Sequence, residues 1–207
     1  MKKIALFDVC HTLVNTSTIR EFTEEYLRSP EHIFWKILRK LGFISDESYR
    51  LHYVKLFKGK SREKIESLGR EYAHHLRTLL KPKTFTLLEQ LRVDGYEIYL
   101  VSAGFDVYLK YFAERLKVQL VCTVLELDEQ GNYTGKFSGI DCYGDGKVTK
   151  FKQVIQGQEI DWENSYSFGD SVTDIPILSL VGNTYVVDPE EELSVYARTQ
   201  GWKRVEQ

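Results

Sequence analysis

The feature that most constrains the fold is one short apolar strand at the start of the chain, separated from all later strands by a long helical block. Residues 4–9 form an apolar run interrupted by a single aspartate, which indicates a strand covered on both faces. Between about Thr18 and Leu80 the apolar spacing is helical throughout, with no strand pattern. After Pro82, strands and helices alternate, which predicts a parallel sheet with helices on both faces.

We therefore expect an α/β fold with a doubly wound parallel sheet and an all-helical cap inserted after the first strand. The core would comprise residues 1–16 and 82–207, and the cap residues 17–81. In open sheets of this kind, ligands bind at the carboxyl ends of the strands. A cap inserted after the first strand would lie over that site, where it could exclude water and read the substrate.

The bounds of the expected elements follow from apolar spacing and turn residues. In the cap, the sequence Thr18-Ile19-Arg20-Glu21 fits a capping box at the start of the first helix. The other cap helices are expected over residues 30–41 and 46–57 and after Ser61. In the core we expect helices over 84–93, 105–116, 147–156, 175–181 and 190–199, strands over 97–101, 120–127, 166–168 and 184–187, and a hairpin turn over 128–132.

Composition excludes several functional classes. The 207 residues include 28 Lys+Arg and 30 Asp+Glu, and a net charge of −2 argues against a nucleic-acid partner. The longest apolar runs are strand-length, which argues against a membrane span. The apolar run after the two N-terminal lysines stops at Asp8, so we do not expect a signal peptide. Three widely spaced cysteines form neither a disulfide framework nor a zinc motif, which favours a reducing, cytoplasmic setting.

Polar residues follow two of the predicted strands in positions suited to phosphate chemistry. Asp8 comes at the end of the first strand, where a carboxylate can serve as a nucleophile or a metal ligand. Ser102, Ala103 and Gly104 end the next strand, and small residues there allow close backbone approach to an anion. Taken alone, each has a simpler interpretation, as a turn aspartate and as an ordinary serine helix cap.

Two further signals lie later in the chain. Lys147 stands at a helix start, against the preference of the helix dipole, and a nearby anion would compensate for this. Asp170 and Asp174 lie four residues apart at a strand-to-helix turn, where paired carboxylates can hold Mg²⁺. A solvated lysine and a Ser171–Asp174 capping box are the structural alternatives.

The order of these residues along the chain resembles that of the haloacid dehalogenase-like (HAD) phosphatase superfamily. Asp, Ser, Lys and Asp-x-x-x-Asp stand in turn at successive strand ends of one sheet. Within the superfamily, the chain looks most like the phosphoserine-phosphatase-like branch (subfamily IB). Two details carry that likeness: the all-helical insertion after the first motif, and the residues from Tyr133 to Gly139 and from Gly146 to Val148.

The resemblance implies Mg²⁺-dependent phosphoryl transfer through an aspartyl-phosphate. Asp8 would attack phosphorus, and Ser102 with the amides of Ala103 and Gly104 would hold the phosphoryl oxygens. Lys147 would neutralise charge between Asp8 and the phosphate. The metal site would comprise Asp8, the Cys10 backbone carbonyl, Asp170 and Asp174. An anionic nucleophile that attacks an anionic phosphate needs such cations.

Position 10 departs from the family's first motif, Asp-x-Asp-x-Thr. The chain has Asp8-Val9-Cys10-His11-Thr12, so a thiol stands where the family has the carboxyl that acts as acid and base. General acid–base catalysis is worth roughly 10²–10⁴-fold, and a free thiol has a pKa of about 8.5. Three hypotheses follow: a slow or specialised phosphatase in which His11 or a substrate group replaces the acid, a phosphotransferase, and an impaired binding or regulatory protein on a phosphatase fold.

The expected substrate is a small phosphorylated metabolite, because a capped site excludes large polymers. Of the arginines in the insertion, Arg20 is nearest in sequence to the first motif and is our candidate for contact with the substrate. The alternative for Arg20 is a solvated arginine on a helix face. The sequence does not indicate the oligomeric state.

Overall fold

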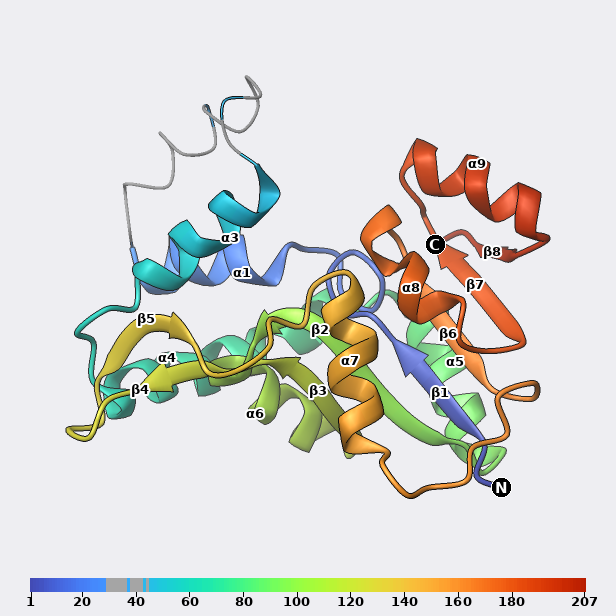
Figure 1. Cartoon of the computed structure of the whole chain (residues 1–207), viewed down its shortest axis with the longest axis horizontal. Helices are drawn as coiled ribbons and strands as arrows, with labels where there is room; N and C mark the ends of the chain where they lie inside the picture. Colours follow the sequence, from blue (N-terminus) through green and yellow to red (C-terminus); the bar gives the residue numbers. More distant parts are fainter. Residues whose placement is uncertain (29–36, 38–42, 44) are drawn as a thin grey trace.

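The computed structural model describes residues 1–28, 37, 43 and 45–207. Its centre is a parallel sheet of six strands in the order β3-β2-β1-β6-β7-β8. The expected α/β architecture is therefore confirmed (Figure 1). The strands are β1 Ile4–Phe7, β2 Glu97–Phe105, β3 Gln119–Thr123, β6 Tyr166–Gly169, β7 Asn183–Val187 and β8 Lys203–Val205.

Both faces of the sheet are covered by helices, which explains the continuous apolar run of β1. Ala5 and Phe7 belong to the buried cluster on one face, with Leu88 of α5 and Leu109 of α6. Ile4 and Leu6 belong to the cluster on the other face, with Phe151 of α7. The core helices are α5 Pro82–Val93, α6 Asp106–Leu116, α7 Asp145–Val154, α8 Ile175–Leu178 and α9 Glu191–Gln200.

The insertion after β1 is helical in the residues described. It contains α1 (Thr18–Glu21), a π-helical turn over Phe22–Tyr26, α3 (Asp46–Lys55) and α4 (Arg62–Leu76). The helix expected over residues 30–41 lies almost entirely outside the described residues. The expected capping box at Thr18 is wrong: Ser17 precedes α1, and the carboxylate of Glu21 instead accepts a hydrogen bond from the Tyr72 hydroxyl at 2.8 Å.

The strand expected over residues 120–127 is two strands in different sheets. β3 ends at Thr123, and β4 (Leu125–Leu127) pairs antiparallel with β5 (Tyr133–Phe137). The expected turn at residues 128–132 joins β4 to β5 and is confirmed. Because apolar residues occur on both sides of Val124, the sequence pattern indicated one continuous strand and did not predict this change of direction. The hairpin β4–β5 packs beside α3 at the cap end of the molecule (Figure 1).

The two connections between the insertion and the sheet run side by side. Asn15 N donates to Leu79 O at 2.9 Å, and Lys81 N donates to Leu13 O at 2.9 Å, with a β-bridge between Val14 and Leu80. Because both connections are paired, the insertion leaves and returns at one place beside the end of β1. Among the residues described, no helix combines the length and apolar composition that a membrane span requires.

Candidate active site

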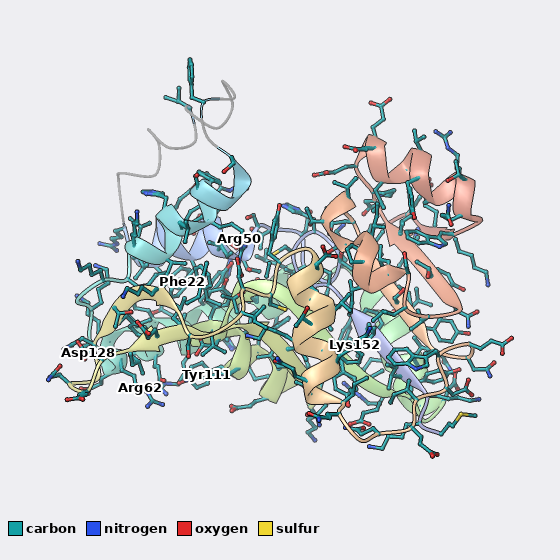
Figure 2. All side chains as sticks on the ribbon, viewed as in Figure 1. Phe22, Arg50, Arg62, Tyr111, Asp128 and Lys152 are labelled. Carbon is teal, nitrogen blue, oxygen red and sulfur yellow. The ribbon has the colours of Figure 1, made fainter. Side chains whose placement is uncertain are left out.

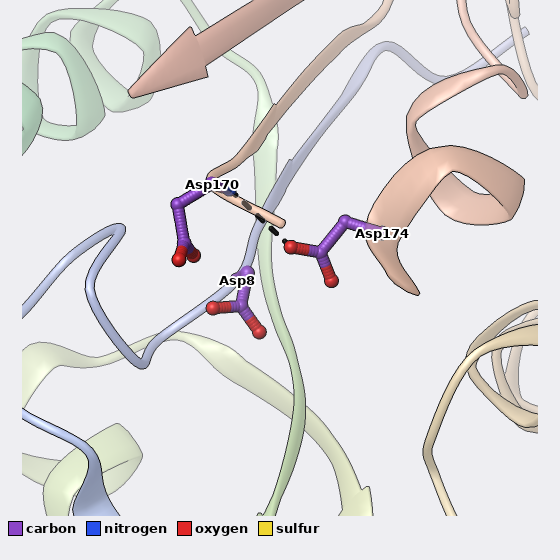
Figure 3. A group of neighbouring side chains, drawn as sticks. All are labelled: Asp8, Asp170 and Asp174. Atoms are coloured by element: carbon purple, nitrogen blue, oxygen red, sulfur yellow. Dashed lines mark hydrogen bonds between the residues drawn. The ribbon is translucent and has the colours of Figure 1, made fainter. Parts of the chain in front are cut away.

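The carboxyl ends of β1 and β6 bring two acidic residues together. The two strands are neighbours in the sheet, with Phe7 in register with Phe168. Asp8 N donates to Phe168 O at 2.9 Å, so the residue after β1 is held against the end of β6. Asp170 follows β6 directly, and Asp174 stands one turn later. Carboxylate oxygens of Asp8, Asp170 and Asp174 lie within 4.8 Å of one another, and Figure 3 shows the three side chains converging.

Lys147 from α7 meets this carboxylate cluster. Its ammonium group donates to Asp8 Oδ1 and to Asp174 Oδ1, both at 2.6 Å. The side chain of Lys147 is only 3% exposed, so this is a buried ion pair and the solvated-lysine interpretation is wrong. Three buried carboxylates face one buried ammonium group, which leaves the cluster with an excess of negative charge when all are ionised.

The pKa values reflect that excess. Burial, with the charge of Asp174, outweighs the attraction of Lys147 and raises the pKa of Asp8 to about 6. Burial and the charges of Asp8 and Asp174 raise the pKa of Asp170 to about 8. Burial acts to lower the pKa of Lys147, but the carboxylates of Asp174 and Asp8 outweigh it and raise that pKa. The site without a metal therefore takes up protons near neutral pH.

Local hydrogen bonds hold the two later aspartates in place. Asp174 Oδ2 accepts from Ser171 N at 3.2 Å and from Asp170 N at 3.3 Å, and the latter bond is drawn in Figure 3. Ser171 and Asp174 form the capping box that the sequence suggested. Asp170 Oδ1 accepts from the Thr12 hydroxyl at 2.7 Å. Capping and proximity to Asp8 therefore occur together at this turn.

Cys10 lies beside the carboxylates in a neutral, hydrogen-bonded environment. Its Sγ atom is 3.1 Å from the Thr18 hydroxyl, which is 3.1 Å from the Tyr108 hydroxyl, and Tyr108 accepts from Phe105 N at 3.0 Å. Burial, and then the charge of Asp8, raise the pKa of the Cys10 thiol to about 11, although hydrogen bonds from Thr18 oppose the shift. Cys10 is therefore a protonated thiol at neutral pH.

The backbone at the end of β2 packs closely against the hydroxyl groups of Thr18 and Tyr108. A Cβ atom on Gly104 would lie 3.0 Å from the Thr18 hydroxyl oxygen and 3.1 Å from that of Tyr108. Glycine is therefore needed for the close approach of the Thr18–Tyr108 pair. Gly104 N donates to Ser102 Oγ at 3.1 Å. Ser102 is fully buried below the pocket, whereas Ala103 and Gly104 line it.

A cavity of about 200 Å³ opens above the carboxylates. It brings together the ends of β1, β2 and β6, the start of α7 and two parts of the insertion. Its lining comprises Asp8, Cys10, His11, Ser17, Ile19, Arg50, Ala103, Gly104, Tyr143, Lys147, Asp170, Ser171, Thr173, Asp174 and Glu190.

Among the described arginines of the insertion, Arg50 of α3 lines this cavity and Arg20 does not. Its guanidinium donates to both carboxylate oxygens of Asp141, at 2.7 and 2.6 Å, and to Ala103 O at 3.0 Å, and it lies over the Tyr143 ring. Figure 2 shows Arg50 between α3 and the sheet. Arg20 is 43% exposed at its side chain and lies 3.9 Å from Glu24.

Sequence reasoning missed Tyr143 and Glu190 as lining residues, and among the arginines of the insertion it chose Arg20 and not Arg50. Tyr143 stands four residues before Lys147, and this proximity to a predicted site residue was the one available signal. Arg50 and Glu190 reach the cavity from elements far from the motifs in sequence, so no spacing rule could have found them.

A family model for the haloacid dehalogenase-like hydrolases matches residues 5–179. The chain belongs to this family. The resemblance seen in the motifs is thereby confirmed, and the chain is an enzyme of the hydrolase class. Several of its relatives carry phosphatase names.

Two relatives with phosphatase names span nearly the whole chain, and a third spans about half of it. A histidinol-phosphatase of Neisseria meningitidis is 24% identical over 98% of this chain and 97% of its own. A probable phosphatase of Mycobacterium tuberculosis is 25% identical over 96% of this chain and 73% of its own. Over 46% of this chain and 44% of its own, a phosphoserine phosphatase of Lactococcus lactis is 32% identical.

Solved structures show the same fold. A Bordetella pertussis protein of unknown function superposes with a TM-score of 0.87 at 23% identity, over 99% of this chain and 98% of its own. A phosphoserine phosphatase in its apo form superposes with a TM-score of 0.70 at 23% identity, over 94% of this chain and 90% of its own.

Proposed function

We propose that this hydrolase removes phosphate from a small phosphomonoester with the help of Mg²⁺, through an aspartyl-phosphate on Asp8. The observation that carries the proposal is the buried cluster of Asp8, Lys147, Asp170 and Asp174 at the carboxyl ends of neighbouring strands, beside a cavity in a chain of this family. Names of the relatives that contain the word phosphatase support the reaction class.

In this mechanism, one carboxylate oxygen of Asp8 attacks phosphorus, the ester P–O bond of the substrate breaks, and the departing oxygen takes a proton from water or from a substrate group. Water then hydrolyses the aspartyl-phosphate, which releases phosphate and regenerates Asp8. Lys147 stabilises the negative charge that gathers beside Asp8. The Lys147 ammonium group already contacts Asp8 Oδ1 at 2.6 Å, so it needs little movement to act. Such preorganised charge is the main contribution that proteins make to phosphoryl transfer. Ala103 and Gly104 would position the phosphoryl oxygens at the cavity wall, and Ser102 would support them from below.

The donor set fits Mg²⁺. The ion prefers oxygen ligands and binds through one or two carboxylates together with substrate phosphate. Asp8, Asp170 and Asp174 offer clustered carboxylates with an excess of negative charge, and the backbone carbonyl of Cys10 is the remaining candidate ligand. When bound, Mg²⁺ would supply charge neutralisation for the transferring phosphoryl group.

The thiol at position 10 supports a second candidate function. The pKa of the Cys10 thiol is raised to about 11, so the thiol is protonated at neutral pH. Cys10 therefore offers no base to activate water. An aspartyl-phosphate on Asp8 would then persist longer, and transfer to an acceptor other than water would compete with hydrolysis. We therefore keep a phosphotransferase as the alternative, and an impaired binding protein as the outcome if no phosphoryl transfer occurs.

The insertion is proposed to act as the substrate-reading cap. We divide the chain into a core of residues 1–16 and 82–207 and a cap of residues 17–81. Two arginines of the cap are the candidates for contact with the part of a small metabolite beyond its phosphate: Arg50 in the cavity wall, and Arg20, whose charge acts on His11 of the same wall.

The test is phosphate release from a panel of small phosphomonoesters, with and without Mg²⁺. We expect release that requires Mg²⁺ and falls by at least about 10⁴-fold in Asp8→Asn, since this change removes the nucleophile. Asp145→Asn, an exposed aspartate at the start of α7, is the matched control and should retain activity.

Mass spectrometry after incubation with a phosphodonor distinguishes the alternatives. A phosphorylated Asp8 with little phosphate release would favour the phosphotransferase. No release and no modification of Asp8 across the panel would refute both proposals and leave a binding role.

A further inference from the structure

A lysine that the catalytic scheme does not use lies directly behind the site. Lys81 is the last residue of the insertion's return connection and is only 7% exposed. Its ammonium group donates to the backbone carbonyl of His11 at 2.5 Å and to Asp188 Oδ2 at 2.8 Å. A buried ammonium group is held in place only when such partners compensate for its loss of water.

Both partners of Lys81 stand at strained points of the backbone. His11 has φ 55° and Asp188 has φ 41°, values that residues with a side chain rarely adopt. Left-handed non-glycine residues are strained and persist where surrounding contacts hold them. The bond from Lys81 is such a contact, because it fixes the peptide group that follows His11.

The residues directly before and after His11, the residue that Lys81 contacts, both belong to the proposed metal site or contact it. Cys10, whose carbonyl is the candidate ligand, precedes His11. Thr12 follows it and donates to Asp170 Oδ1 at 2.7 Å. A change in the backbone angles of His11 would therefore displace the Cys10 carbonyl relative to the Thr12 hydroxyl. Asp188, the other partner of Lys81, lies two residues before Glu190. Glu190 N donates to Asp170 O at 3.1 Å, so this second partner is also connected to Asp170.

We propose that Lys81 is a positioning residue that holds the turn from Cys10 to Thr12 in the conformation that binds Mg²⁺, with Asp188 as its counter-charge. The inference rests on the proposed function, since it concerns the metal site of that reaction. Lys81 also pairs through its backbone with Leu13 at the root of the insertion, so one residue joins the cap connection to the metal site.

The experiment measures binding of Mg²⁺ alone by isothermal titration calorimetry. Loss of contacts that orient metal ligands typically weakens metal affinity by about 10- to 100-fold. Lys81→Met removes the ammonium group and keeps a similar length, and we expect the dissociation constant for Mg²⁺ to rise by at least about tenfold. Lys83→Met is the matched control: Lys83 lies in the first turn of α5, two residues after Lys81, and is exposed. Its ammonium group donates to Glu206 O, away from the metal site, so the Mg²⁺ affinity of this variant should match wild type.

A second measurement separates positioning from general stability. Leu13 N and Val14 N both donate to Val9 O across the turn. We expect amide hydrogen exchange at these two positions to accelerate in Lys81→Met more than exchange in the core strands β1 and β2. A folded Lys81→Met protein with wild-type Mg²⁺ affinity would overturn the proposal, even if its melting temperature were lower.

If Lys81→Met does not fold, Asp188→Asn decides the question, because it weakens the hold on Lys81 at a more exposed residue. We expect a several-fold loss of Mg²⁺ affinity, and an unchanged affinity would overturn the proposal. The outcome for the proposed function is distinct: it fails if the wild-type protein itself neither binds Mg²⁺ nor releases phosphate.

Discussion

The floor of the cavity has a charged half and a neutral half. The charged half is built from the ends of β1 and β6 and the start of α7, and its side chains are Asp8, Asp170, Asp174 and Lys147. The neutral half is formed by Cys10. Its thiol is hydrogen-bonded to the hydroxyl of Thr18, which contacts the hydroxyl of Tyr108, and both of these residues are buried behind the cavity wall.

The two halves differ in what they do with protons. In the charged half, Asp8 has a pKa of about 6 and Asp170 a pKa of about 8, so both carboxyl groups exchange protons near neutral pH when no metal is present. The thiol of the neutral half, with a pKa of about 11, keeps its proton there. In the mechanism proposed above, the charged half would supply the nucleophile, whereas the neutral half would supply no group to move the protons that complete hydrolysis. Burial alone therefore does not set the protonation of a side chain in this cavity: the carboxyl groups of Asp8 and Asp170 and the thiol of Cys10 all have raised pKa values, but only the carboxyl groups titrate near neutral pH.

The largest effect is expected from placing a carboxylate in the neutral half. Cys10→Asp should raise the rate of Mg²⁺-dependent phosphate release by about 10²–10⁴-fold, because it supplies the missing acid and base. The measurement is kcat for release from the best substrate of the panel.

The control for this change is Cys10→Ser, which also removes the thiol but adds no carboxylate, and which should give no comparable gain. If Cys10→Asp binds Mg²⁺ normally and shows no gain, the neutral half is not what limits hydrolysis, and the comparison fails.

An intermediate effect concerns pH and the charged half. The folded-state pKa values of Asp8 and Asp170 are raised above the ordinary value of 3.8. Their contribution to stability is therefore fully present below about pH 4 and is lost as pH rises through about 6 and then about 8. We expect the melting temperature of the metal-free protein to fall by several degrees relative to Asp8→Asn/Asp170→Asn as pH rises from 5 to 8.5.

Mg²⁺ should reverse this trend, since it binds the ionised carboxylates. The rise in melting temperature on adding Mg²⁺ is expected to be larger at pH 8 than at pH 5. A stabilisation by Mg²⁺ that is independent of pH would contradict the assignment of these carboxylates as its ligands.

The smallest effect is expected from loosening the neutral half. Tyr108→Phe removes the hydroxyl that contacts Thr18 and accepts from Phe105 N, and it leaves the ring packing in place. A hydrogen bond contributes about 0.5–1.5 kcal/mol, which corresponds to a loss in kcat of up to about tenfold if Cys10 is less well held. Mg²⁺ affinity should not change, because the charged half is untouched.

Tyr111→Phe on the same helix is the matched control, because its hydroxyl bonds to Arg70 and Glu66 away from the cavity. An equal loss of kcat in both variants would show that the chain from Tyr108 to Cys10 has no particular role.

Much of the architecture follows from local pattern. The apolar run of β1 requires two covered faces, and the alternation after Pro82 requires a parallel sheet, so the α/β fold was predictable. The split between β3 and β4 was not, because Thr123, Val124 and Leu125 suit either one strand or two. β8 also escaped prediction: its short, mostly exposed strand, Lys203–Val205, lacks an apolar pattern.

The amino-acid sequence alone places the chemical groups of the site along the chain. Asp8 follows β1, and Asp170 and Asp174 follow β6. Lys147 stands on α7, and a thiol stands where the family has a carboxyl. Parallel neighbouring strands end at one edge, so these residues had to meet once the sheet formed. Three contacts became known from the tertiary structure alone. Arg50 lines the cavity and Arg20 does not. Thr18 and Tyr108 form a hydrogen-bonded chain with Cys10, and Lys81 donates to the His11 carbonyl. Those contacts join elements distant in sequence through side-chain packing, which no local spacing records.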